Sequence, residues 1–245
     1  MEETQFLAVL IPETLSVVQA FELFTRSLKA TLPHSDALAN DLKSAGVKVR
    51  KRGVSLLPLS VADFEFDYAQ VLHKRLDWLS IRAATLPGEF CQIMIRELHQ
   101  TGTLVMAVVL NRHYDYWQNA EDPLQFKAAG RSMQGLPMKS NGLPPPLAQD
   151  VVDISHNPGR RIIRNGFIEV PSYLTWTTDH FWKLGCSRRE LLGAVPGIVI
   201  NDDAPGLMRI QVGSKCFSSA ECEEARLQDM LRESLFGNRE SSDAS

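Results

Sequence analysis

The first thirty residues join a short apolar segment to a long amphipathic one, and this pairing constrains the fold more than any other feature. Gln5 to Ile11 is apolar and is followed at once by Pro12, which is typical of a buried strand. Glu13 to Leu32 then repeats apolar residues at helical spacing and ends before Pro33. The apolar stripe consists of Leu15, Val17, Val18, Phe21, Phe24 and Leu28. We expect a sheet with amphipathic helices packed on it.

Three further segments extend this pattern through the first half of the chain. Lys43 to Arg52 places charged residues around Val47 and Val49, which predicts an exposed alternating strand or hairpin arm. Phe64 to Leu79 has apolar residues compatible with a second amphipathic helix. Glu89 to His99 fits either a helix or a strand; we favour the helix, followed by a buried strand from Leu104 to Leu110.

The second half contains paired strands and two capping signals. Asn165-Gly166 is the preferred two-residue hairpin turn, and it lies between short strands at Arg161 to Ile163 and Gly166 to Val170. Two more strands, Ile198 to Ile200 and Leu207 to Val212, are expected on either side of a turn at Asn201-Asp202-Asp203. Capping boxes begin helices that run to Ala194 and to Phe236; they are Ser187-Arg188-Arg189-Glu190 and Ser218-Ser219-Ala220-Glu221.

The interleaving of helices and strands lacks strict βαβ order, so we expect an α+β fold with a mixed, mainly antiparallel sheet. Residues 1–236 are expected to form a single domain, with a possible subdivision at 131–158. That stretch is rich in Gly, Pro, Ser and Asn, which predicts a long loop or a linker. The polar segment 237–245 is expected to be a disordered tail.

Composition excludes several classes of protein. The formal charge of the 245 residues is -3, which is too balanced for a protein that works on nucleic acid or on an anionic membrane. The N-terminus lacks the positive charge of a secretory signal, and no apolar run is long enough to span a membrane. Together with four cysteines that show no CxxC pair, this predicts a cytoplasmic protein with free thiols.

No motif in the sequence reveals a reaction. Phosphate-binding glycine loops and the GxSxG nucleophile motif are absent, and no two histidines are four residues apart. We therefore expect no cofactor, no metal and no catalytic residues. The alternative is a small hydrolase or transferase with a site assembled from His113, Asp115 and Asp202.

Two groups of residues indicate recognition of a protein partner. Tyr114, Tyr116 and Trp117 form an aromatic cluster beside charged residues, and Tyr and Trp are common anchors of protein interfaces. The segment from Ser219 to the C-terminus carries a net charge of -4, which would attract a basic partner such as a nuclease. The candidate partner-binding residues of this acidic segment are Glu221, Glu223 and Glu224.

The stretch from Pro144 to Trp182 resembles a known family. It contains the run DVVDISHNPGRR, then paired strands and a W-x-x-x-x-x-W spacing between Trp176 and Trp182. This stretch is similar in sequence to bacterial immunity proteins of polymorphic toxin systems, of the immunity protein 52 type. Such proteins accompany restriction-endonuclease-like toxins, including one delivered by type VI secretion.

The resemblance implies a cytoplasmic antitoxin that binds a cognate nuclease toxin encoded by a neighbouring gene. Binding would block the access of DNA to the active site of the toxin. The resemblance implies no direct binding of nucleic acid or membrane, and it assigns no residues to the interface. A third alternative, beside the antitoxin and the hydrolase or transferase, is a structural adaptor or chaperone of a secretion apparatus. Such a protein would bind several partners weakly.

Overall fold

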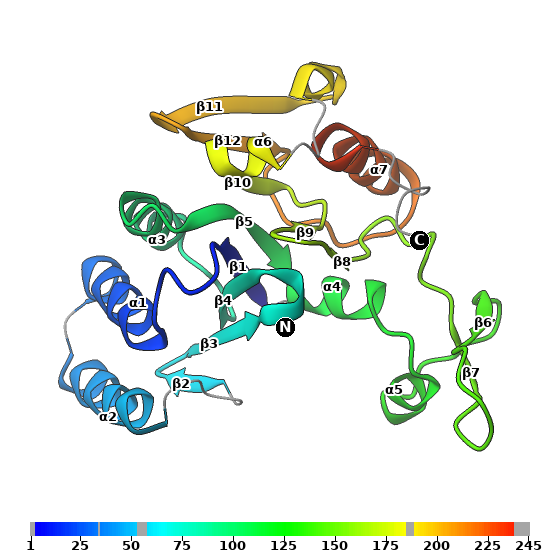
Figure 1. Cartoon of the computed structure of the whole chain (residues 1–245), viewed down its shortest axis with the longest axis horizontal. Coiled ribbons are helices and arrows are strands. Elements are labelled where there is room, and N and C mark those ends of the chain that lie inside the picture. The colour runs from blue at the N-terminus through cyan, green and yellow to red at the C-terminus, as the bar shows by residue number, and fades with distance from the viewer. Residues whose placement is uncertain (1–2, 34, 53–57, 185–188, 238–245) are drawn as a thin grey trace.

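The computed structural model describes residues 3–33, 35–52, 58–184 and 189–237. Its centre is an eight-stranded antiparallel sheet in the order β11-β12-β10-β5-β1-β4-β3-β2 (Figure 1). Strands β1 to β5 of this sheet are β1 (Thr4–Leu10), β2 (Leu59–Val61), β3 (Phe64–Val71), β4 (Leu76–Ala83) and β5 (Leu104–Asn111). The later strands are β10 (Leu174–Thr178), β11 (Ile198–Ala204) and β12 (Leu207–Val212). The α+β class expected from the sequence is confirmed.

The two middle strands are buried on both faces, which explains their continuous apolar sequence. Every residue of β5 is buried, and so are the six residues of β1 that follow Thr4. Strand β1 pairs with β4 on one side and with β5 on the other, both in antiparallel register. The strands predicted at Gln5 to Ile11 and at Leu104 to Leu110 are thereby confirmed.

One face of the sheet is covered by α1 (Val17–Thr31), α2 (Asp36–Arg52) and α3 (Gly88–Gln100), which lie together on one side in Figure 1. Helix α1 begins with a capping box in which Ser16 and Gln19 bond reciprocally, and it confirms the helix predicted between Glu13 and Leu32. Helix α3 confirms the favoured helical interpretation of Glu89 to His99. The core between these helices and the sheet contains packed phenylalanine rings, namely Phe21, Phe24, Phe64, Phe66 and Phe90.

The other face packs against α6 (Asp179–Lys183), α7 (Cys222–Phe236), the 3₁₀ turn η2 (Arg189–Ala194) and the hairpin of β8 (Ile162–Ile163) and β9 (Ile168–Glu169). Phe167, Phe181 and Phe236 contact one another in this second core. The hairpin around Asn165-Gly166 is confirmed, with Gly166 at φ 87°, where a left-handed backbone favours glycine. Residues 131–158 contain one more hairpin, β6 (Met138–Ser140) with β7 (Asp150–Val152), between α5 (Pro123–Ala128) and the second core.

Two predictions in the first half are wrong. Lys43 to Arg52 is the second half of α2 and not a strand, because Leu38, Leu42, Ala45 and Val49 form one buried stripe at helical spacing. Phe64 to Leu79 is not a helix but β3, a short 3₁₀ turn η1 (Leu72–Lys74) and the start of β4. In β3 the buried side chains alternate with less buried ones, as expected for a strand with one face in the core.

Two predictions in the second half are wrong, and two others are not tested. Asp202 and Asp203 lie within β11, and the turn to β12 is at Pro205-Gly206, where Gly206 has φ 72°. Helix α7 begins at Cys222 without a side-chain cap; instead of the predicted capping box, the Glu224 carboxylate accepts the N–H groups of residues 218 and 219. The first capping signal at Ser187 and the tail beyond Gly237 lie outside the described residues.

Candidate protein-interaction site

The outer edge of β11 is the first part of the candidate site. It is the last strand on one side of the sheet, and no labelled element lies beyond it in Figure 1. An edge strand presents unpaired backbone groups, and proteins use such edges to bind an extended segment of a partner. With seven residues, β11 is long enough to form a ladder with a second strand.

The register shows which backbone groups of β11 face outward. Hydrogen bonds of a middle antiparallel strand alternate between its two neighbours. The N–H of Val212 donates to the carbonyl oxygen of Tyr173 at 2.8 Å. Val212 and every second residue before it in β12 therefore bond toward β10, and the residues between them bond toward β11. Val199 lies opposite one of these intermediate residues and bonds to β12. The N–H and C=O groups of Ile200 and Asp202 therefore point away from the sheet, and no hydrogen bond to them is found in the described residues.

Two adjacent aliphatic side chains flank this edge. Val199 is 53% exposed and Ile200 is 42% exposed, although both lie in a strand of a large sheet. They point to opposite faces: Ile200 lies opposite the buried Ile210 of the second core, whereas Val199 lies on the face that carries α3. A long edge strand with exposed aliphatic residues is typical of a surface that binds another chain.

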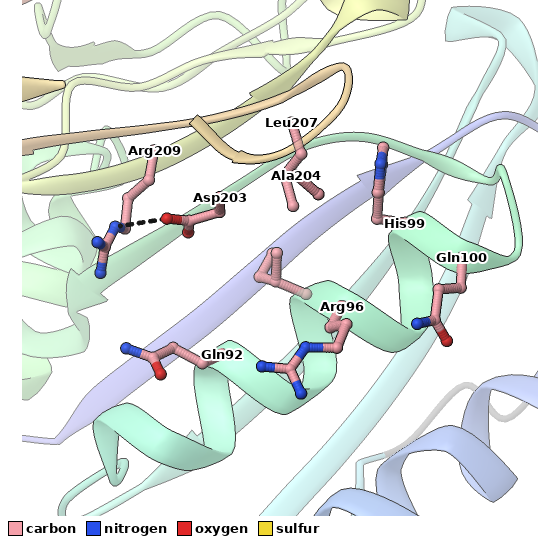
Figure 2. Close-up of a pocket in the computed structure, with 9 residues that line it drawn as sticks. Gln92, Arg96, His99, Gln100, Asp203, Ala204, Leu207 and Arg209 are labelled. Atoms are coloured by element: carbon pink, nitrogen blue, oxygen red, sulfur yellow. Dashed lines mark ion pairs between the residues drawn. The ribbon is translucent and has the colours of Figure 1, made fainter. Parts of the chain in front are cut away.

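A groove beside the edge forms the second part of the site (Figure 2). It lies between α3 and the β11–β12 hairpin and has a volume of about 380 Å³. Helix α3 contributes Gln92, Arg96, His99 and Gln100, and the hairpin faces them with Asp203, Ala204, Leu207 and Arg209. The groove exists because the helical layer ends at α3, so that the face of β12 and β11 beyond it is open.

Asp203 fixes the hairpin above this groove. Its carboxylate accepts a hydrogen bond from Nε1 of the buried Trp176 at 3.1 Å. The other carboxylate oxygen lies 3.3 Å from Nε of Arg209. His99 Nε2 lies 3.1 Å from the carbonyl oxygen of Pro205 in the turn, so α3 is also joined to the hairpin. These contacts join the hairpin wall of the groove to β10, β12 and α3.

The three aromatic residues predicted to bind a partner lie on α4 (Arg112–Gln118) but do not form one exposed patch. Tyr114 is half-buried, and its hydroxyl donates to Oε1 of Gln228 in α7 at 3.0 Å. Burial raises the pKa of Tyr114 to about 12. Trp117 packs against Phe126, and the Arg131 guanidinium carbon lies 4.2 Å from its ring centre. Among the three, Tyr116 alone is exposed, at 46%.

The acidic residues of α7 are divided between surface and structural roles. Glu221 and Glu223 are exposed, and Glu223 forms an ion pair with Arg226 at 2.8 Å that lowers the pKa of its carboxyl. Glu224 is half-buried and accepts backbone N–H groups at the start of the helix, so it fixes the preceding loop. Of the three predicted acidic contacts, two are therefore available to a partner.

The residues of the alternative enzyme site are not brought together. Asp202 lies near the end of the sheet where β5 begins, whereas His113 and Asp115 follow the end of β5, about 17 Å away at ~3.3 Å per residue. His113 Nε2 accepts from the indole N–H of Trp117 at 3.1 Å and does not contact Asp115. Asp115 is buried and paired with Arg161; its pKa is raised by burial, and the cation opposes that shift.

The described residues contain no group of three or more His, Cys, Asp or Glu side chains arranged to hold a metal ion. Cys91 and Cys222 are free thiols, as predicted, whereas Cys186 lies outside the described residues. No helix in the described part of the chain is long and apolar enough to cross a membrane.

Comparison with known proteins adds little. No protein-family model matches the chain, and neither does any curated protein. Among solved structures, a T6SS protein of Pseudomonas aeruginosa is similar with a TM-score of 0.47 and 13% sequence identity, covering 100% of this chain and 78% of that one. A likeness of this size carries no conclusion about function. The resemblance to immunity proteins of the 52 type stays a prediction.

The sequence did not indicate the edge or the groove. It predicted strands at Ile198 to Ile200 and Leu207 to Val212, and both are confirmed, but periodicity contains no information on which strand lies outermost. The available signal was the absence of clean alternation in IVINDD, where Val199 and Ile200 are adjacent apolar residues with no polar residue between them.

Proposed function

We propose that this chain is an immunity protein, an antitoxin that binds one cognate secreted toxin and neutralises it. The observation that carries the proposal is the free edge of β11, with outward backbone groups at Ile200 and Asp202 and exposed side chains at Val199 and Ile200. An extended segment of the toxin adds to the sheet here as a ninth strand. Main-chain hydrogen bonds then supply affinity, and the flanking side chains supply specificity.

A nuclease is the toxin class that fits the acidic surface. Asp202 lies on the edge itself, and Glu190, Glu221, Glu223, Asp229 and Glu233 are exposed on η2 and α7 or at the start of α7. Nucleases bind DNA through basic clefts, and acidic surfaces attract such clefts at long range. Bound in this way, the chain blocks the access of DNA to the toxin's active site. The resemblance of residues 144–182 to immunity proteins points to the same function.

The test is co-purification of the chain with the product of the neighbouring gene, followed by titration calorimetry. We expect a one-to-one complex of nanomolar affinity, about -12 kcal/mol. Expression of the chain should also restore growth to cells that express that product. No complex and no rescue would overturn the proposal.

The edge is tested by Ile200→Pro, which removes an outward N–H and leaves the bonds to β12 in place. This variant should fold, bind about tenfold to a hundredfold more weakly and rescue growth less well. A matched control comes from the opposite edge of the sheet. The hydrogen bond from Arg112 N to Glu3 O shows that Glu3 bonds toward β5. Since bonding alternates along each strand, the registers of β1, β4 and β3 then give Ser60 of β2 an outward N–H as well. Ser60→Pro should bind and rescue normally.

A further inference from the structure

The groove between α3 and the β11–β12 hairpin is rich in cationic and amide side chains, although the chain as a whole is acidic. Arg96 and Arg209 line it together with His99, Gln92 and Gln100. Asp203 is the one carboxylate among the lining residues of this groove, and it is already bound to Trp176 and Arg209.

No acidic residue lies three or four positions from Arg96 on its own helix. The residues four before and four after it are Gln92 and Gln100, and the residues three away are Ile93 and His99. Side chains at these spacings are the ones that meet on a helix surface. Arg96 is exposed, and no ion pair to it is found in the described part of the chain.

Arg209 lies on the opposite wall, where Asp203 pairs with its Nε side and no ion pair to its terminal guanidinium nitrogens is found in the described residues. Its Nε atom is buried and makes no hydrogen bond within the described residues, although Asp203 Oδ1 lies 3.3 Å away. In Figure 2 the guanidinium group projects from β12 beside Asp203, and Arg96 and Gln92 lie across from it on α3. An anion in this groove would gain charge-assisted hydrogen bonds from both sides.

The groove lies on the α3 face of the sheet, and a strand added to β11 would also direct every second side chain toward that face. Side chains that alternate with Ile200, such as Val199, point toward the α3 face. A ninth strand would lie about 10 Å from β12, since neighbouring strands are ~4.8 Å apart. A glutamate from that strand and the long side chain of Arg209 would reach toward each other across this gap.

We infer that the groove is a carboxylate-binding subsite of the interface. It takes an acidic side chain from the segment of the partner that pairs with β11, and Arg96 and Arg209 hold that carboxylate. This inference rests on the proposed function. It adds a chemical requirement, namely that the pairing segment carries Asp or Glu on the face toward α3, although the toxin's DNA cleft is basic.

The first experiment uses the product of the neighbouring gene as the probe. Arg96→Glu should weaken the complex about tenfold or more, because it places a negative charge against the bound carboxylate. Arg50→Glu is the matched control: Arg50 is also an exposed helical arginine, it lies on α2, and its reversal changes the net charge equally. It should bind as the original chain does.

Wild-type affinity of Arg96→Glu, combined with weakened binding by Ile200→Pro, would overturn the subsite and leave the proposed function standing. Equal weakening by Arg96→Glu and Arg50→Glu would also overturn it, since that result reports general electrostatics.

The second experiment needs no toxin and covers the case in which the neighbouring product does not bind. Two acetylated peptides with the seven-residue length of β11 are titrated into the labelled chain, one alternating Val and Glu and the other alternating Val and Gln. The Glu peptide should shift the side-chain Nε–H resonances of Arg96 and Arg209, and the Gln peptide should not. Equal shifts, or none, would overturn the subsite even if the proposed function were correct.

Discussion

Replacing Ile200 by proline separates the binding role of β11 from its structural role. The N–H of Ile200 points away from the sheet and makes no bond to β12, so its loss should change the free energy of unfolding by less than about 1 kcal/mol. In the complex the same N–H donates to a carbonyl of the added strand. Losing that bond leaves a buried carbonyl oxygen without a donor, which costs about 1–3 kcal/mol, and the pyrrolidine ring obstructs the approach of the partner. The dissociation constant should therefore rise about tenfold to a hundredfold.

The neighbouring position provides an internal comparison. Val199 donates its N–H to β12, so Val199→Pro removes an existing ladder bond and should destabilise the hairpin by about 1–3 kcal/mol. Urea unfolding measures the stability of both variants, and titration calorimetry measures their binding. If Ile200→Pro destabilised the chain as much as Val199→Pro, the outward orientation of Ile200 would be refuted. If it bound with unchanged affinity, the role of the edge in the complex would be refuted.

Three further predictions concern stability. Tyr114→Phe leaves the amide oxygen of buried Gln228 without its hydroxyl donor and should cost about 1–2 kcal/mol in urea unfolding; no loss would show that this bond contributes nothing. Burial raises the pKa of Cys91 from 9.0 to about 12, so its thiol contributes stability that is complete below pH 9 and is lost as pH rises toward 12. Cys91→Ala should flatten this alkaline fall in the free energy of unfolding, and an unchanged dependence on pH would contradict the prediction. Gly206→Ala adds a Cβ 2.9 Å from Asp179 Oδ2 at φ 72° and should destabilise the chain by about 1–3 kcal/mol in thermal unfolding, whereas a neutral result would contradict the strain.

Local patterns predicted the elements whose apolar residues agree with one period only. Helix α1 and strand β5 are of this kind, and the hairpin is set by Asn165-Gly166. Both periods fit the segment of α3, and there the favoured helix is confirmed. The errors occur where two periods compete. In α2 the pair Val47 and Val49 imitates a strand, but Val49 belongs to the buried helical stripe and Val47 is 46% exposed. In β3 the apolar residues fit both patterns, and pairing with β4 decides between them.

The candidate site could not be predicted in the same way, because it depends on strand order. The exposure of Val199 and Ile200 follows from the outermost position of β11, and the groove follows from the end of the helical layer at α3. Both are properties of the assembled sheet. The residues chosen for their chemistry, such as Tyr114, have mostly structural contacts instead.

The strand order also divides the sheet into two wings that come from different parts of the chain. Strands β4, β3 and β2 lie on one side of the central β1–β5 pair and come from residues 59–83, whereas β10, β12 and β11 lie on the other side and come from residues 174–212. Strands β11 and β12 lie at the outer end of the second wing, and most of β11 is incompletely buried, whereas β1 and β5 are buried in the middle of the sheet. Amide hydrogen exchange should therefore find β11 and β12 opening as a unit, at lower free energy than β1 and β5. The proposed interface is then among the less stable parts of the sheet, so binding of the partner should protect β11 and β12 from exchange.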